Sequence, residues 1–264
     1  MQTAKQKLKR AAPWLFLLLV LAGLAAVRGL AANYEIGYEI MNGDFQNYNP
    51  VRHLLAGQVP YRDFTVYLGA GELYSVGGLL LVLGNSFGRS MFATNFCTWF
   101  YFELLVLAVC LVVIGTARAA RAAALALCSV FFAYVQGANL PFAGQVNTLL
   151  SYAAANGNSA RMMRSAALTL AVLVILLGLH FWQQDTSRRL LAPAVLVPFA
   201  AGFFVPWSND MGGAAYISIA LGYGLYLIRL YRSSIGKIVV QTLRYIVTSV
   251  VGLGVSVLLI SWGH

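Results

Sequence analysis

The chain has 264 residues, of which 60% are hydrophobic and 10% are charged, whereas ordinary globular proteins have about 25% charged residues. Because long apolar runs recur along the whole sequence, this composition excludes a soluble domain built around one core. The net charge of +10 does not indicate a nucleic-acid-binding protein, because the basic residues stand at the ends of apolar runs, where they set membrane topology and contact lipid headgroups.

The N-terminal segment joins a basic head, which ends at Arg10, to an apolar run from Ala11 to about Ala32. Such a head is also typical of a cleaved signal peptide, but further apolar runs follow, so we interpret the segment as a retained signal-anchor. The positive-inside rule then puts the N-terminus in the cytoplasm, and we expect the protein in a bacterial inner membrane.

Eight further apolar runs predict that residues 1–264 form a single, all-α, polytopic transmembrane domain of about nine spans. The run Pro141–Ala155 is the weakest, and a re-entrant path there would reverse the orientation of every later span. The eight runs are Val66–Gly84, Met91–Gly115, Ala119–Tyr134, Pro141–Ala155, Ser165–Gln183, Leu190–Trp207, Ala214–Leu230 and Val239–Gly263.

Nine spans place residues 34–65 outside the membrane and two pairs of arginines on the same outer side, against the positive-inside rule. The pairs are Arg118 with Arg121, and Arg161 with Arg164. Two interpretations stay open at this point. Either internal hairpins tolerate the wrong charge, or the outward arginines bind an anionic lipid headgroup.

Three cysteines, Cys97, Cys110 and Cys128, fall inside apolar runs, and neither they nor the three histidines have the spacing of metal ligands. We therefore expect the cysteines to act as small buried hydrophobes and expect no structural metal site.

The loop at residues 34–65 is the only long non-membrane stretch, and with the start of the next run it holds five of the eight acidic residues. Its mixture of charges, amides and aromatics suits a polar, sugar-like ligand, although the charges would equally keep a plain loop solvated. Pro50 is expected to begin an amphipathic surface helix that ends at Gly57. The five acidic residues are Glu35, Glu39, Asp44, Asp63 and Glu72.

Three segments resemble the GT-C superfamily of integral membrane glycosyltransferases. They read G-Q-V-P-Y-R-D-F from Gly57, L-V-L-G-N-S-F-G-R from Leu81, and N-L-P-F-A-G-Q-V-N from Asn139. The resemblance covers about residues 1–150. It implies a polyprenyl-phosphate-linked sugar as donor and a catalytic carboxylate in the first outward loop. The paired acidic motif of some GT-C branches is missing, because Asp44 follows Asn42 and Gly43.

Sugar transfer from a phosphate leaving group needs a base for the acceptor hydroxyl and positive charge for the departing phosphate. The resemblance gives the base role to Asp44, whose alternative is an ordinary turn residue. Arg62 would bind phosphate in a bidentate manner and Asp63 would bind a sugar hydroxyl, unless the two form a simple loop ion pair.

Three further acidic residues are candidates by position. Glu72 and Glu103 lie inside apolar runs, where a charge is costly and usually faces a cavity or a partner such as an arginine. Asp210 would end the seventh span on the outer side, where it would approach Asp44 and bind sugar hydroxyls or a divalent cation. Its alternative role is a helix cap. With Arg62, Asp63, Arg118 and Arg121, Glu72 and Asp210 make up the expected substrate-binding set.

We therefore expect an inverting membrane glycosyltransferase that transfers a lipid-linked sugar to a glycolipid or cell-envelope polysaccharide on the outer face. Two alternatives stay open: a transporter or flippase for lipid-linked sugars, which would use Glu72 and Glu103, and a non-catalytic subunit of a membrane-protein assembly. A requirement for Asp44 in transfer separates the first interpretation from the others.

Overall fold

The computed structural model describes residues 4–34, 42–114, 116–135 and 192–264. All regular elements in these ranges are helices, and the only β-type pairing there is an isolated bridge between Pro60 and Phe64. Four described helices are long and apolar enough to cross a membrane, so the protein is a membrane-embedded helical protein. Their apolar stretches are Ala11–Leu30, Phe87–Leu111, Met211–Leu230 and Ile235–Ile260.

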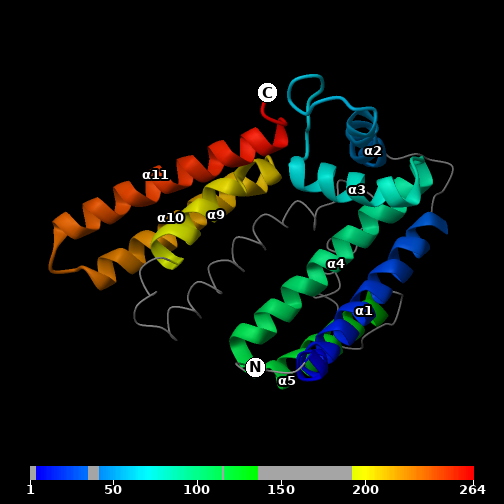
Figure 1. Ribbon diagram of the computed structural model, residues 1–264, viewed down its shortest axis with the longest axis horizontal. Coiled ribbons are helices and arrows are strands. Elements are labelled where there is room, and N and C mark those ends of the chain that lie inside the picture. Colours follow the sequence, from blue (N-terminus) through cyan, green and yellow to red (C-terminus); the bar gives the residue numbers. More distant parts are fainter. Residues whose placement is uncertain (1–3, 35–41, 115, 136–191) are drawn as a thin grey trace. The chain divides into compact units, whose positions relative to one another are not determined.

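The chain divides into two compact units, each formed by two separate stretches of sequence. Unit 1 contains residues Met1–Asp44 and Ser86–Met162, and unit 2 contains Phe45–Asn85 and Met163–His264. We describe each unit by itself (Figure 1).

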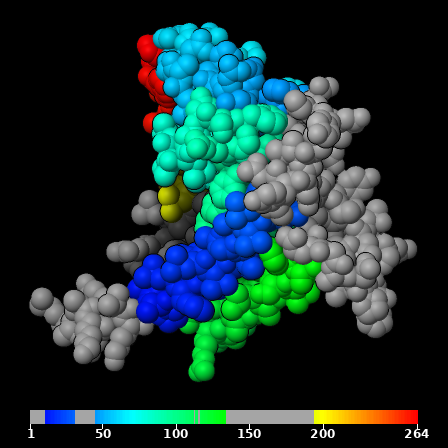
Figure 2. Space-filling view, turned by 90° about the vertical axis from the view of Figure 1, so that its right-hand side faces the viewer, coloured from blue at the N-terminus to red at the C-terminus, as the bar shows by residue number. Residues whose placement is uncertain are grey.

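Unit 1 is built from α1 (Ala4–Tyr34), α4 (Phe87–Ile114) and α5 (Ala117–Val135). Helices α1 and α4 run antiparallel: Gly29, near the end of α1, lies against Phe92, near the start of α4. Figure 2 shows α1, in blue, lying along α5, in green, and contacts between these two helices agree with that view.

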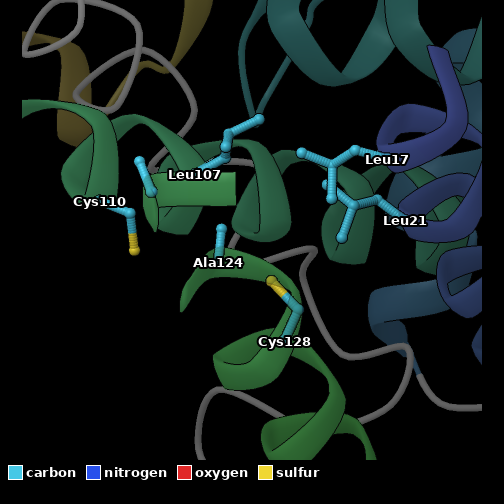
Figure 3. Close-up of a cluster of buried hydrophobic side chains, with 7 residues drawn as sticks. Leu17, Leu21, Leu107, Cys110, Ala124 and Cys128 are labelled. Atoms are coloured by element: carbon cyan, nitrogen blue, oxygen red, sulfur yellow. The ribbon is translucent and has the colours of Figure 1, made fainter. Parts of the chain in front are cut away.

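The core of unit 1 lies where its three helices meet (Figure 3). Leu17 and Leu21 of α1 and Leu107 of α4 belong to one buried cluster with small side chains of α5. Those small side chains, Ala120, Ala124 and Cys128, recur every fourth residue and so form one face of the helix. Cys97, Cys110 and Cys128 are all buried, which confirms the interpretation of the cysteines as small hydrophobes.

The antiparallel course of α1 and α4 corrects one expectation about the arginines. Arg121 stacks over the Trp14 ring, with its guanidinium carbon 4.7 Å from the ring centre, so the α4–α5 link lies at the end of unit 1 where α1 begins. Arg118 and Arg121 are therefore on the side of the basic N-terminal head. The nine-span arrangement put them on the opposite side because it counted one span more between α1 and this link.

That extra span corresponds to α3 (Ala70–Leu83), which belongs to unit 2. Its 14 residues cover roughly 21 Å, short of the roughly 30 Å hydrocarbon core. The expected span at Leu190–Trp207 is instead three short pieces, η1 (Ala192–Leu196), α9 (Val197–Phe203) and η2 (Val205–Trp207). The expected spans Pro141–Ala155 and Ser165–Gln183 lie outside the described residues.

Unit 2 also contains two long helices, α10 (Met211–Leu230) and α11 (Ile235–Ile260), joined by a short turn. Helix α9 packs closely on α11: a Cβ at Gly202 would overlap the backbone of Ser249, and a Cβ at Gly252 would overlap the carbonyl oxygen of Phe199. Small residues at such crossings let membrane helices approach to backbone contact, where dispersion forces hold them together.

The surface helix of the first loop begins earlier than expected. Helix α2 spans Asn42–Leu55, so Pro50 lies inside it and not at its start. Gly57 ends this segment as expected: its φ of 82° is in the left-handed region, and its N–H donates to the Leu54 carbonyl.

Candidate functional site

The polar end of unit 2, which we call the polar cap, consists of residues 56–69, 207–210 and 261–264. In Figure 2 the C-terminal residues, in red, lie against the cyan segment that contains the first of these stretches. Tyr74 of α3, the helix that follows residues 56–69, holds the C-terminal residues: its hydroxyl donates to the Ile260 carbonyl over 2.8 Å and accepts from Trp262 Nε1 over 3.0 Å. The polar cap thus joins three stretches that are far apart in the sequence.

Asn209 fixes the loop of the polar cap to the start of α10. Its Nδ2 donates to the carbonyl oxygens of Val66 and Tyr67, at 2.6 and 2.9 Å. Its Oδ1 accepts from the Tyr61 hydroxyl over 3.4 Å. One amide side chain therefore satisfies two loop carbonyls and orients an exposed phenol.

Arg62 and Asp63 form a bidentate ion pair, with Nε–Oδ1 and Nη2–Oδ2 distances of 2.9 and 3.0 Å. This is the loop ion pair that the sequence offered as the alternative to ligand binding, and a role of the two residues in binding substrate stays a prediction. Asp63 Oδ2 also accepts from the Val59 N–H over 2.8 Å. These hydrogen bonds, first that of Arg62 and then that of Val59, lower the pKa of the Asp63 carboxyl to about 2. A carboxylate with so low a pKa is a weak proton acceptor, so Asp63 suits binding of a hydroxyl and not general-base catalysis.

Asp210 caps α10. Its Oδ1 accepts from the Met211 N–H over 2.9 Å and from the Ser208 hydroxyl over 3.0 Å. This is the capping role that the sequence offered as the alternative to sugar binding. A role for Asp210 in binding substrate stays a prediction.

Several aromatic side chains of the polar cap are exposed. Tyr61, Tyr67 and Trp262 have exposed fractions of 48%, 66% and 47%. Tyrosine and tryptophan gather where a membrane meets water, because their rings are apolar and their N–H or O–H groups are polar. The polar cap therefore has the composition of an interfacial surface. The same side chains are suited to stacking on sugar rings.

Asp44, the expected general base, lies in the first turn of α2. Its side chain lies outside the described part of the structure, so its expected approach to Asp210 stays a prediction. The alternative role of Asp44 as a turn residue likewise stays a prediction.

Glu72 and Glu103 are both buried, with exposed fractions of 4% and 1%. Glu72 stands in the first turn of α3, where the positive end of the helix dipole stabilises an anion. Glu103 lies in the middle of α4 and close enough to Cys128 for an electrostatic interaction. Neither of its carboxylate oxygens has a hydrogen-bond partner among the described residues, so the expected arginine partner is not found there.

The structure thus brings Arg62, Asp63 and Asp210 together in the polar cap and leaves Arg118 and Arg121 in unit 1. Sequence reasoning missed Asn209, Tyr61 and Trp262. The signal for Asn209 was weak: it stands beside Asp210 in a typical capping sequence, and its loop partners lie about 140 residues away. In the described ranges no three His, Cys, Asp or Glu side chains cluster as metal ligands.

Comparison with known proteins gives no relative: no family model matches this chain, and neither a curated protein nor a solved structure does. The resemblance to GT-C enzymes therefore stays an expectation from the sequence.

Proposed function

We propose that the protein is a membrane glycosyltransferase that uses a polyprenyl-phosphate-linked sugar and acts at the polar cap. The observation that carries this proposal is the fixed, exposed arrangement of Tyr61, Arg62, Asp63 and Asn209. It combines a guanidinium, a carboxylate, an amide and a phenol on one interfacial surface. This is the set of groups that binds a phosphate and the hydroxyls of a sugar at the same time.

In this proposal Asp44 removes the proton of the acceptor hydroxyl as that oxygen attacks the anomeric carbon. The attack comes from the face opposite the phosphate, and the bond between the anomeric carbon and the phosphate oxygen breaks. The configuration at the anomeric carbon therefore inverts. Arg62 balances the charge on the departing lipid phosphate, Asp63 and the Tyr61 hydroxyl hold sugar hydroxyls, and Asn209 keeps Tyr61 in place. A divalent cation is a further candidate for balancing the charge of the departing phosphate. The acceptor is a glycan or glycolipid of the cell envelope.

The proposed orientation follows from positive charge. The N-terminal head, the α4–α5 link with Arg118 and Arg121, and the α10–α11 turn with Arg232 would face the cytoplasm of a bacterial inner membrane. The polar cap, at the opposite ends of α10 and α11, would then face outward. Because they would face the cytoplasm, Arg118 and Arg121 are not part of the proposed outward site.

A transporter for lipid-linked sugars is the second candidate, and buried Glu103 favours it. An acidic side chain that lies inside a membrane protein without a partner often marks a transport path. A non-catalytic assembly subunit is the third candidate, and it requires no catalytic carboxylate at all.

The test is transfer by the purified full chain with a panel of polyprenyl-phosphate sugars, in the native sequence and in Asp44→Asn. We expect Asp44→Asn to lower turnover by about 100-fold or more and to change donor binding little, because the base acts only in the transition state. Gln46→Asn, an exposed position in the same helix, is the control and should keep full activity. Near-normal transfer by Asp44→Asn would exclude Asp44 as the base. Transfer from none of the donors would favour the second and third candidates.

A further inference from the structure

A groove of about 230 Å³ runs between α10 and α11 in unit 2. The two helices form a hairpin, drawn in orange and red in Figure 1. The groove is mainly apolar, but three tyrosines and a threonine contribute to its walls. Its principal lining residues are Tyr216, Tyr223, Gly224, Leu227, Thr242 and Tyr245.

One wall of the groove carries a buried hydroxyl without a partner. Tyr245 is 4% exposed, and its hydroxyl makes no hydrogen bond to any residue that the structure describes. A buried hydroxyl without a partner costs about 1–3 kcal/mol, so a small turn of the Tyr245 ring that brings the hydroxyl to an acceptor in the groove would be favourable.

The surroundings of the groove are strongly basic. Arg244 is exposed and adjacent in sequence to Tyr245, and it is near enough to Tyr223 for its positive charge to act on that side chain. Three more basic residues, Arg229, Arg232 and Lys237, lie near the turn of the same hairpin. Residues 211–264 contain no aspartate or glutamate. The hairpin therefore has four arginine and lysine side chains and no acidic residue to balance them.

We propose that this groove binds an anionic phospholipid, with part of one acyl chain between α10 and α11 and the phosphate at Arg244. The volume is below the roughly 300–1,000 Å³ of pockets that enclose a whole small ligand, so it accepts a section of chain and leaves the rest in the bilayer. The phosphate oxygens supply the negative charge that balances Arg244 and its basic neighbours. A lipid ester oxygen can accept a hydrogen bond from the Tyr245 hydroxyl. This site does not depend on the proposed catalysis at the polar cap.

The test is native mass spectrometry of the full chain, titrated with phosphatidylglycerol or with phosphatidylcholine of the same acyl chains. We expect one phosphatidylglycerol to be retained about tenfold more tightly than phosphatidylcholine. Arg244→Gln should weaken that binding about fivefold, the usual contribution of one basic residue near an anionic lipid.

A pair of glycine substitutions on α10 separates the groove from general lipid contact. Gly224 lines the groove and Gly222 does not, while a Cβ at either position would meet no atom within 4 Å. Gly224→Leu should fill the groove and weaken phosphatidylglycerol binding about tenfold, because loss of contact with two methylene groups has that effect. Gly222→Leu should bind as the native chain does.

Three outcomes would overturn the proposal: equal retention of the two lipids, equal effects of the two leucine substitutions, or displacement of the lipid by equimolar glycerol phosphate, which has the headgroup charge and no acyl chain. If Gly224→Leu fails to fold, Arg244→Gln still decides the matter, because this exposed side chain can be changed without disturbing the core.

Discussion

Glu103 shows how one residue can work against the stability of a membrane helix bundle. It is 1% exposed, and neither carboxylate oxygen has a hydrogen-bond partner in the described ranges. A buried polar group without a partner costs about 1–3 kcal/mol, and a protein can retain such a cost when the group has a function. The transporter interpretation gives Glu103 such a function, as part of a transport path.

We predict that Glu103→Leu makes the protein more stable by about 1–3 kcal/mol, because leucine has a similar size and no polar atoms to bury. Glu103→Gln keeps a polar group at the same place and should be close to the native chain in stability. Thermal unfolding in one detergent measures both variants. A Leu variant less stable than the native chain would show that Glu103 has a stabilising partner.

At the scale of helices, the crossing of α9 and α11 depends on glycine. Gly252 lies directly against the carbonyl oxygen of Phe199, and α9 itself has only 7 residues. So short a helix has few hydrogen bonds of its own relative to its unsatisfied ends, and its stability comes mainly from packing.

We predict that Gly252→Ala destabilises unit 2 by about 1–3 kcal/mol, the usual effect of overpacking a tight contact. Gly254→Ala on the same helix is the matched control, because a Cβ there would meet no atom within 4 Å. It should leave stability unchanged or raise it by up to about 1 kcal/mol through helix propensity. Thermal unfolding compares the two variants, and equal effects would contradict the proposed role of the crossing.

The sequence predicts α1, α4, α10 and α11 well, because each has a long uninterrupted apolar run. It fails at α3 and α9, since an apolar run indicates burial but does not separate a full span from a short buried helix. The start of α2 was missed because Pro50 was taken as a first-turn residue, whereas the helix carries this proline in its interior. Of the contacts in the polar cap, only the ion pair between the neighbouring residues Arg62 and Asp63 could be predicted from the sequence. The contacts of Asn209 with Val66 and Tyr67 join distant segments and have no signal in either segment alone.

For the whole molecule, the side on which Arg118 lies separates the nine-span arrangement from the one seen here. With a cytoplasmic N-terminus, the antiparallel α1 and α4 put Arg118 inside and α2 outside. We therefore predict that Asn49→Cys reacts with an impermeant thiol reagent when only the outer membrane is permeabilised. Arg118→Cys should react only after the inner membrane is opened.

Asn49 and Arg118 are both exposed, and the three native cysteines are buried, so the unsubstituted chain should give little background labelling. Labelling of both variants from outside would restore the extra span. Labelling of Asn49→Cys only from inside would reverse the orientation and remove the proposed outward site.

The broken stretch η1–α9–η2 has a consequence for how the protein is made. Its helix ends leave backbone groups that cannot stay unsatisfied in lipid, and α9 buries its surface against α11, which the ribosome completes only at Ile260. At about 5–20 residues per second, that partner arrives roughly 3–12 s after α9 has been synthesised. During that interval the nascent segment needs shelter in the insertion machinery or at the membrane surface. A ribosome that stalls within α11 would release a chain whose α9 has lost its partner, and membrane proteases would degrade it.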